Sequence, residues 1–220
     1  MCGMDKEARM NITGFNAGIT ENLSDSFTRT GGKHARPRLL LHSCCGPCST
    51  AVIERLYADY DITVFYYNPC ITDAEEYEHR KAEQIRFISE FNAEHSCGQI
   101  KYMEGRYDPR EYYEQAAEYS EEPEGGKRCE VCFRIRLRET AKNAARLKFD
   151  LFSTTLSVSP HKNYKLIAEI GREAAEEFGT EFLAEDFKKK AGFQRSIQLS
   201  KEHGLYRQNY CGCEYSKRGE

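Results

Sequence analysis

The sequence predicts an α/β fold, with a Rossmann-like parallel sheet covered by helices on both faces, and two observations carry this prediction. Short runs rich in β-branched and aromatic residues alternate with helical segments of ten or more residues along residues 37–220;. The first apolar run, residues 38–42, is continuous rather than alternating, as expected for a strand buried on both faces;. Right-handed crossovers between such strands place helices on both faces of the sheet.

The first half of this region contains two strands and two helices. Residues 38–42 follow a proline and form the first strand, and residues 49–60 have helical spacing of apolar side chains;. Residues 62–67 form a second strand that ends at an Asn-Pro pair;. A long helix then begins after Thr72 or Asp73, either of which can cap it. Its periodic apolar residues are Tyr77, Ile85, Phe87, Ile88 and Phe91.

The second half continues the alternation. Residues 100–103 are a third strand, and Asp108 with Pro109 opens a helix, because proline suits the first helical turn;. Residues 121–127 contain one proline and two glycines and form a loop that leads to Cys129;. The remaining predicted elements are a helix over 132–147, a strand over 150–155, a helix over 161–178 and a strand over 180–184.

Composition and charge limit the classes of protein to which this chain can belong. Residues 1–36 mix glycine, polar and charged residues without periodicity and predict a flexible N-terminal extension, whereas residues 37–220 predict a single domain with a C-terminal cysteine-containing extension;. No run approaches the roughly 20 apolar residues that cross a membrane, and the polar first 25 residues do not resemble a secretion signal, so we expect a cytoplasmic protein without a membrane partner. The net charge of −3 gives no general signature of nucleic-acid binding;. Any polyanion needs a local basic patch, and DNA is not expected as a partner.

Cysteines are the most informative residues. Seven of the ten fall into three close groups, and Cys2, Cys70 and Cys97 are isolated. In a reducing compartment, closely spaced cysteines are more often metal ligands or redox-active than structural cross-links. Three such groups can converge on one polynuclear metal centre. The groups are Cys44, Cys45 and Cys48; Cys129 and Cys132; and Cys211 and Cys213.

The first group occupies the turn between the first strand and the first helix. In open α/β sheets, ligands bind beyond the carboxyl ends of the strands, near the point where strand order reverses. Cys48 then lies in the first turn of a helix, whose positive N-terminal end lowers thiol pKa and favours thiolates. Residues 45–48 also match the thioredoxin active-site tetrapeptide. This chain has no tryptophan, and thiol–disulfide exchange alone would leave the other two groups unused.

The other two groups extend the set of thiolates beyond one zinc site. Alone, Cys129 and Cys132 would favour a structural zinc knuckle. Adjacent thiolates such as those of Cys44 and Cys45 diverge along the backbone, which suits separate irons of a cluster better than one tetrahedral zinc. Six or seven thiolates also exceed the four ligands that one zinc or one cluster needs, so a second redox or metal element is implied.

Five ordered motifs span residues 38–216. They comprise the strand with Cys44-Cys45-Gly46-Pro47-Cys48; Tyr67-Asn68-Pro69 with Glu76, Tyr77 and Arg80; Arg128-Cys129-Glu130-Val131-Cys132; residues 152–162; and residues 192–196 with 206–213. In these motifs the chain resembles the epoxyqueuosine reductases of the QueH type. Cys70 stands where relatives often have asparagine, and we exclude it from the site.

The resemblance implies a HUP-type fold and reduction of epoxyqueuosine to queuosine at the wobble base of tRNA, the last step of queuosine biosynthesis. It also implies a 4Fe-4S cluster with a possible additional mononuclear iron nearby. On this basis Cys44, Cys45, Cys129 and Cys132 are expected to ligate the cluster. Cys211 and Cys213 are expected to form a redox-active dithiol or to bind the second iron, and Cys48 is a possible ligand of that iron. Electrons would come from an external donor.

Substrate tRNA and a proton donor need further residues. Lys188, Lys189, Lys190, Arg195 and Arg207 form the densest basic stretch, interleaved with aromatic residues that can stack on unpaired bases, and they are expected to contact tRNA;. A lysine run is more often simply a solvated face. His42 and Tyr210 border the cysteine groups and are candidate proton donors, although a buried histidine at a strand end is more often a core residue.

Two other functions stay open from the sequence. An ATP-dependent tRNA-modifying enzyme of the HUP type would need a glycine-rich phosphate loop after the first strand. That turn contains one glycine and three cysteines instead. The other alternative is a zinc-stabilised RNA-binding module without enzymatic activity.

Overall fold

The fold is a five-stranded parallel sheet with helices on both faces, as the sequence predicts. The computed structural model describes residues 36–95 and 99–217, so the predicted N-terminal extension lies almost entirely outside the described residues. The sheet has the order β3-β2-β1-β4-β5, and each neighbouring pair is parallel. Its strands are β1 (Arg38–Ser43), β2 (Asp61–Tyr66), β3 (Lys101–Glu104), β4 (Leu151–Thr154) and β5 (Glu181–Phe182).

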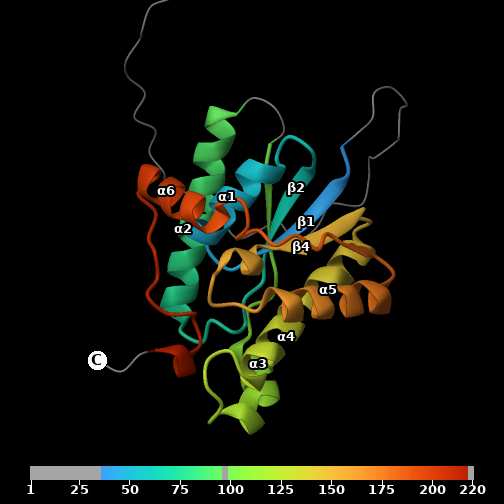
Figure 1. Cartoon of the computed structure of the whole chain (residues 1–220), viewed down its shortest axis with the longest axis vertical. Helices are drawn as coiled ribbons and strands as arrows, with labels where there is room; N and C mark the ends of the chain where they lie inside the picture. Colours follow the sequence, from blue (N-terminus) through green and yellow to red (C-terminus); the bar gives the residue numbers. More distant parts are fainter. Residues whose placement is uncertain (1–35, 96–98, 218–220) are drawn as a thin grey trace, which may run out of the picture. The chain divides into compact units, whose positions relative to one another are not determined.

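Helices cover the two faces in two groups. Figure 1 shows α1, α2 and α6 on one side of the sheet and α4 with α5 on the other. The helices are α1 (Gly46–Leu56), α2 (Ala74–Glu94), α3 (Pro109–Ala116), α4 (Lys127–Arg146), α5 (Tyr164–Phe178) and α6 (Gly192–Glu202), with short 3-10 turns at Ala117–Tyr119, Thr155–Val158 and Glu214–Ser216. In the described ranges, none of the helices is long and apolar enough to cross a lipid bilayer.

Alternation along β1 explains why this strand lies at the centre. Leu39 and Leu41 pack in the core beneath α1 and α2, whereas Leu40 packs in the core beneath α4 and α5. All three leucines are fully buried. Successive side chains of a strand point to opposite faces, so only a continuous apolar run can serve a sheet covered on both sides.

Strand order places the reversal point beside the first cysteine group. From β1 the chain adds β2 and β3 on one side and later returns to add β4 and β5 on the other. The switch therefore lies between β1 and β4, where the turn after β1 carries Cys44, Cys45 and Cys48;. This is the location that the sequence predicts for the site.

Element boundaries differ from the sequence predictions at several points. Helix α4 begins at Lys127, so Cys129 lies inside its first turn rather than in a preceding loop. Helix α5 begins at Tyr164 because Asn163 caps it by accepting hydrogen bonds from two backbone N–H groups;. Asp73 caps α2, as expected. Helix α6 has no counterpart among the predicted elements.

The buried face of α2 is also more polar than predicted. Ile85 is 43% exposed, although its spacing suggested a core position. Arg80 and Gln84 take the buried face instead, in line with Tyr77, Phe87 and Phe91. Both polar side chains support the site described below.

Candidate metal centre

Cys44, Cys45 and Cys48 form a compact group of thiols. Their Sγ atoms all lie within 4.8 Å of one another, and the Sγ atoms of Cys44 and Cys45 are 3.9 Å apart. Cys44 and Cys45 are buried and Cys48 is half-buried. Three soft ligands at this spacing could hold a metal ion such as zinc or iron.

A buried polar network holds the loop that carries this group. Gln84 accepts a hydrogen bond from Ser43 Oγ at 2.6 Å and donates one to Ser49 Oγ at 2.9 Å. Asn68 donates to the backbone carbonyl of Ser43 at 2.9 Å. The loop is therefore tied to α2 and to the end of β2 on both sides of the thiols. Gln208 also donates to Cys45 Sγ at 3.1 Å.

Hydrogen bonds within the group separate the pKa values of its thiols. Hydrogen bonds with the thiols of Cys45 and Cys48 hold the pKa of Cys44 well below its ordinary value. The hydrogen bond with Cys44 raises the pKa of Cys45 to about 11, and hydrogen bonds with Cys44 and Cys45 raise that of Cys48 well above its ordinary value. The expectation that the helix N-terminus lowers the thiol pKa at Cys48 is therefore wrong for the metal-free turn, because hydrogen bonds with Cys44 and Cys45, together with burial, raise the pKa of Cys48. A bound metal ion would displace the remaining protons, because its charge favours thiolates.

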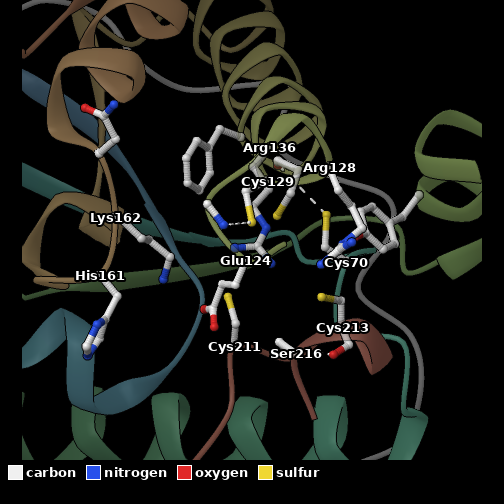
Figure 2. A pocket seen from close by; sticks show the side chains of 15 residues that line it. Cys70, Glu124, Arg128, Cys129, Arg136, His161, Lys162, Cys211, Cys213 and Ser216 are labelled. Carbon is white, nitrogen blue, oxygen red and sulfur yellow. Dashed lines mark hydrogen bonds between the residues drawn. The ribbon is translucent and has the colours of Figure 1, made fainter. Parts of the chain in front are cut away.

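The other cysteine groups meet at a cavity next to this turn. Cys129 and Cys132 come from α4, and Cys211 and Cys213 come from the C-terminal segment (Figure 2). The cavity has a volume of about 70 Å³. One ordered water needs roughly 10–15 Å³ of such space. The cavity therefore has room for a small inorganic group.

The two thiols of α4 have different hydrogen-bond partners. Cys129 Sγ accepts a hydrogen bond from the backbone N–H of Gly125 at 3.2 Å, while burial raises the pKa of Cys129 to about 11. A hydrogen bond with the Cys70 thiol, together with burial, raises the pKa of Cys132. All eight cysteines in the described ranges, 36–95 and 99–217, are free thiols.

The C-terminal segment is anchored to the start of α2. Arg80, only 1% exposed, donates from Nη1 to the carbonyl of Cys211 at 2.9 Å and from Nη2 to the carbonyl of Tyr210 at 3.2 Å. Its Nε pairs with Glu76 at 2.7 Å, and its guanidinium lies over the Tyr210 ring. The backbone N–H of Thr72 donates to the carbonyl of Gly212. These bonds bring Cys211 and Cys213 to the cavity although both lie far along the chain.

Two cationic side chains line the cavity together with the thiols. Their charge bears on whether an anionic metal–thiolate group fits there. Lys162 and Arg136 both line the cavity (Figure 2). Although burial lowers it, the charges of Cys211 and Cys44 raise the pKa of Lys162 above its ordinary value. In the described part of the chain, Nε and Nη1 of Arg136 have no hydrogen-bond partner. A thiolate-rich centre with positive charge beside it is a suitable donor set for an iron–sulfur cluster.

Cys70 lies outside the site predicted from the sequence, but the structure brings its thiol to the cavity. It is buried, comes from the loop after β2, and its Sγ lies 3.9 Å from the carbonyl oxygen of Cys132. Figure 2 shows it facing the same space as Cys213. Its isolation in sequence gave no signal of this proximity. Arg136, in contrast, follows Cys132 by four residues, and helical spacing alone places both on one face of α4;.

The two candidate proton donors differ in their surroundings. His42 is fully buried, its Nδ1 lies 2.9 Å from Thr154 Oγ1, and its Nε2 lies 3.1 Å from the carbonyl oxygen of Tyr67. Burial lowers the pKa of His42 to about 3. It is a neutral core residue with both ring nitrogens engaged. Tyr210 is half-buried under Arg80, and burial raises its pKa, so its hydroxyl stays protonated at neutral pH.

The five basic residues predicted to contact tRNA do not share one environment. Lys189 and Lys190 are exposed, and Lys188 donates to the backbone carbonyl of Lys162 at 3.1 Å. Arg195 pairs with Glu54 and lies 3.8 Å from Glu202. Arg207 donates to Ser200 Oγ and to the carbonyl of Ser196. Lys188 therefore binds a residue that lines the cavity, while both arginines support the packing of α6.

Comparisons with known proteins point to one family over almost all the described residues. The family model described as epoxyqueuosine reductase QueH matches residues 39–219. The epoxyqueuosine reductase QueH of Streptococcus pyogenes serotype M1 is 43% identical over 183 residues, which cover 83% of this chain and 71% of the relative. The Staphylococcus epidermidis protein of that name is 39% identical over 82% of this chain and 76% of its own length. The Thermotoga maritima one is 36% identical over 81% and 89%.

Proposed function

Because this chain belongs to the epoxyqueuosine reductase QueH family, we propose that it reduces epoxyqueuosine to queuosine at the wobble position of tRNA. The observation that carries the proposal is the family match over almost all the described residues, which includes all three cysteine groups. Membership favours this reaction over ATP-dependent tRNA modification and over a zinc-stabilised RNA-binding module. A tRNA-modifying enzyme of this kind would work in the cytoplasm.

The cluster ligands in this proposal are Cys44, Cys45, Cys129 and Cys132. Cys48 joins a second iron, and Cys211 with Cys213 either joins that iron or acts as a dithiol. The proximity of Cys48 to Cys44 and Cys45 supports its role beside the cluster, and the shared cavity supports Cys211 and Cys213. When bound, a 4Fe-4S cluster and an iron would supply single electrons and a Lewis acid.

The overall reaction is balanced by two electrons and two protons. Both carbon–oxygen bonds of the epoxide break, a carbon–carbon double bond forms, and the oxygen leaves as water. As a dithiol, Cys211 and Cys213 would supply both electrons and both protons and become a disulfide, which an external donor then reduces. Otherwise, the external donor supplies both electrons, Tyr210, held against Arg80, donates one proton, and solvent supplies the other.

The modified base of the tRNA must approach the cavity from the protein surface. An anticodon loop can present an unstacked base to a protein surface. Lys188 binds the backbone of Lys162 and is followed by the exposed Lys189 and Lys190, while Arg195 lies on α6 and Arg207 hydrogen-bonds to it. We propose that these residues contact the phosphates of the loop while the modified base reaches the thiol groups.

The decisive experiment is anaerobic turnover. Iron-replete protein is mixed with epoxyqueuosine-containing tRNA and a strong chemical reductant, and nucleosides are measured by mass spectrometry. We expect queuosine to form. Iron-replete protein that yields no queuosine contradicts the proposed reaction. A colourless protein with bound zinc and no iron would favour the RNA-binding module instead.

Cysteine variants test the ligand assignment. We expect Cys132→Ala to lose most of the iron and the brown colour after anaerobic reconstitution. Cys70→Ala is the matched control. It removes a buried thiol from the same cavity, and the proposal does not count this thiol as a metal ligand. Iron loss in the Cys70 variant equal to that in the Cys132 variant would show that the assignment is wrong.

A further inference from the structure

Arg136 is a buried cation that the proposed reaction does not use. Its side chain is 1% exposed and ranks among the largest fully buried side chains of the described residues. Nε and Nη1 have no hydrogen-bond partner in that part of the chain, and no carboxylate forms a salt bridge with Arg136 there. By contrast, Arg134 and Arg138 on the same helix pair with Glu173 and Glu177.

The surroundings of Arg136 are thiols rather than carboxylates. It lines the cavity with Cys70, Cys132 and Cys211, and one helical turn separates it from Cys132. Although burial lowers it, the charges of Cys132, Cys70 and Cys44 raise the pKa of Arg136 above its already high value. Arg136 therefore shares the cavity with thiols from the loop after β2, α4 and the C-terminal segment, and the charge of Cys44 in the turn after β1 also acts on it.

A buried guanidinium without a counter-ion is strongly destabilising, since its desolvation is not offset. A native fold that keeps one must provide negative charge nearby. Thiolates bound to iron supply that charge, and their sulfur atoms accept hydrogen bonds. Positive charge and hydrogen bonds at the sulfur atoms also favour the reduced state of an iron–sulfur centre, because reduction adds negative charge.

We propose that Arg136 is the fixed counter-charge of an anionic metal–thiolate group in this cavity and that it raises the reduction potential of that group. This inference rests on the proposed function, since it takes the bound group to be an iron–sulfur cluster. Arg136 is a tuning residue rather than a metal ligand. Its effect is on how readily the centre accepts an electron from the external donor.

The test compares three variants after anaerobic reconstitution with iron and sulfide. Arg136→Met removes the charge with a small change in side-chain volume. Arg136→Lys keeps the charge. Arg138→Met is the matched control, because it removes an exposed cation from the same helix. The midpoint potential is measured by redox titration followed by absorbance and electron paramagnetic resonance, and iron per chain is measured in parallel.

We expect the potential of Arg136→Met to fall by at least about 59 mV, a tenfold change in the reduction equilibrium of a one-electron couple. Arg136→Lys should keep most of the wild-type potential, and Arg138→Met all of it. If Arg136→Met loses the centre while Arg136→Lys retains it, the positive charge is needed for the centre to bind, which also supports the counter-charge role. A wild-type potential in iron-replete Arg136→Met overturns the proposal. Equal loss of iron in both Arg136 variants also overturns it, and so does a wild-type protein that binds no iron–sulfur centre.

Turnover of epoxyqueuosine tRNA separates this inference from the proposed function. Intact turnover with an unchanged potential in Arg136→Met overturns the role of Arg136 alone. A shifted potential in Arg136→Met, together with a wild-type protein that produces no queuosine, overturns the reaction and leaves the counter-charge standing.

Discussion

Gly212 is the residue whose backbone conformation allows two thiols to reach the cavity together. Its φ of +126° lies in a region that residues with a Cβ rarely adopt;. A Cβ would also lie 3.0 Å from Ile71 Cγ1 and 3.1 Å from Arg80 Nη1. The glycine between Cys211 and Cys213 thus permits both the turn and its close packing against Arg80.

Gly212→Ala should therefore destabilise the protein by about 1–3 kcal/mol and displace the two thiols. Chemical unfolding and the alkylation rates of Cys211 and Cys213 measure these effects. Gly179→Ala is the control, because Gly179 also has a positive φ but has open space around its Cβ position. Equal alkylation rates in the two variants would show that Gly212 does not position the thiols.

At the scale of elements, α2 supports both ends of the site through its buried polar face. Gln84 holds the turn between β1 and α1, and Arg80 holds the C-terminal segment. Neither residue would be chosen for a helix face by hydrophobicity. Their positions follow from the backbone and hydroxyl groups that need partners beneath the helix, since an unpaired buried polar group is costly.

Gln84→Leu should cost about 1–3 kcal/mol, because Ser43 and Ser49 each lose a hydrogen-bond partner in the interior. It should also weaken metal binding by Cys44, Cys45 and Cys48, measured by competition with a chelator. Gln198→Leu, on the exposed face of α6, is the control. Unchanged chelator competition in Gln84→Leu would mean that the turn holds its shape without this network.

The Arg80 anchor gives a second prediction at this scale. The double variant Arg80→Met with Glu76→Gln removes the buried ion pair without leaving a single charge;. We expect Cys211 and Cys213 to react faster with alkylating agents, since Arg80 no longer binds the carbonyls of Tyr210 and Cys211. Lys81→Met with Glu78→Gln removes a more exposed pair from the same helix and should leave the rates unchanged. Rates unchanged in both would exclude the anchoring role.

At the scale of the whole molecule, the net charge is negative, whereas the surface around Lys188, Lys189 and Lys190 carries local positive charge. The chain carries a net charge of −3, yet Lys189 and Lys190 are exposed beside the segment that leads to the cavity. Binding of a polyanion therefore depends on this local surface rather than on long-range attraction. Lys188 also holds the backbone of Lys162, so its replacement has a structural effect as well as an electrostatic one.

Changing Lys188, Lys189 and Lys190 to alanine should weaken tRNA binding and make it less sensitive to salt. Each lost phosphate contact reduces the slope of log affinity against log salt by about 0.7–0.9, so three contacts reduce it by about 2. A Lys189→Ala, Lys190→Ala variant separates binding from the support of Lys162. Alanine at Lys101, Lys142 and Lys148 removes the same charge elsewhere. If the triple variant of Lys188, Lys189 and Lys190 binds tRNA with normal affinity and normal salt dependence at physiological salt, these lysines do not contact the tRNA.

The sequence by itself determined the alternation of strands and helices, the central buried strand and the thiol-rich turn at its end. These features are local, because strand and helix periodicities are set within a few residues. The ordered motifs also indicated the family before any geometry was known. Cys48 in the first helical turn and Asp73 as the cap of α2 are local features of the same kind, and both are confirmed.

Only the tertiary structure decided which side chains meet. Arg80 and the carbonyl it binds at Cys211 are separated by 131 residues, and nothing in their local patterns links them. The same holds for Cys70 beside Cys132 and for Arg136 among thiols from four segments. The physical reason is that convergence depends on strand order and on pairing of buried polar groups across the fold, whereas periodicity fixes only the face on which a residue lies. The sequence supplied the thiols, and the packing of α2 and α4 around the end of β1 placed one group in the turn after β1 and the other two around a neighbouring cavity.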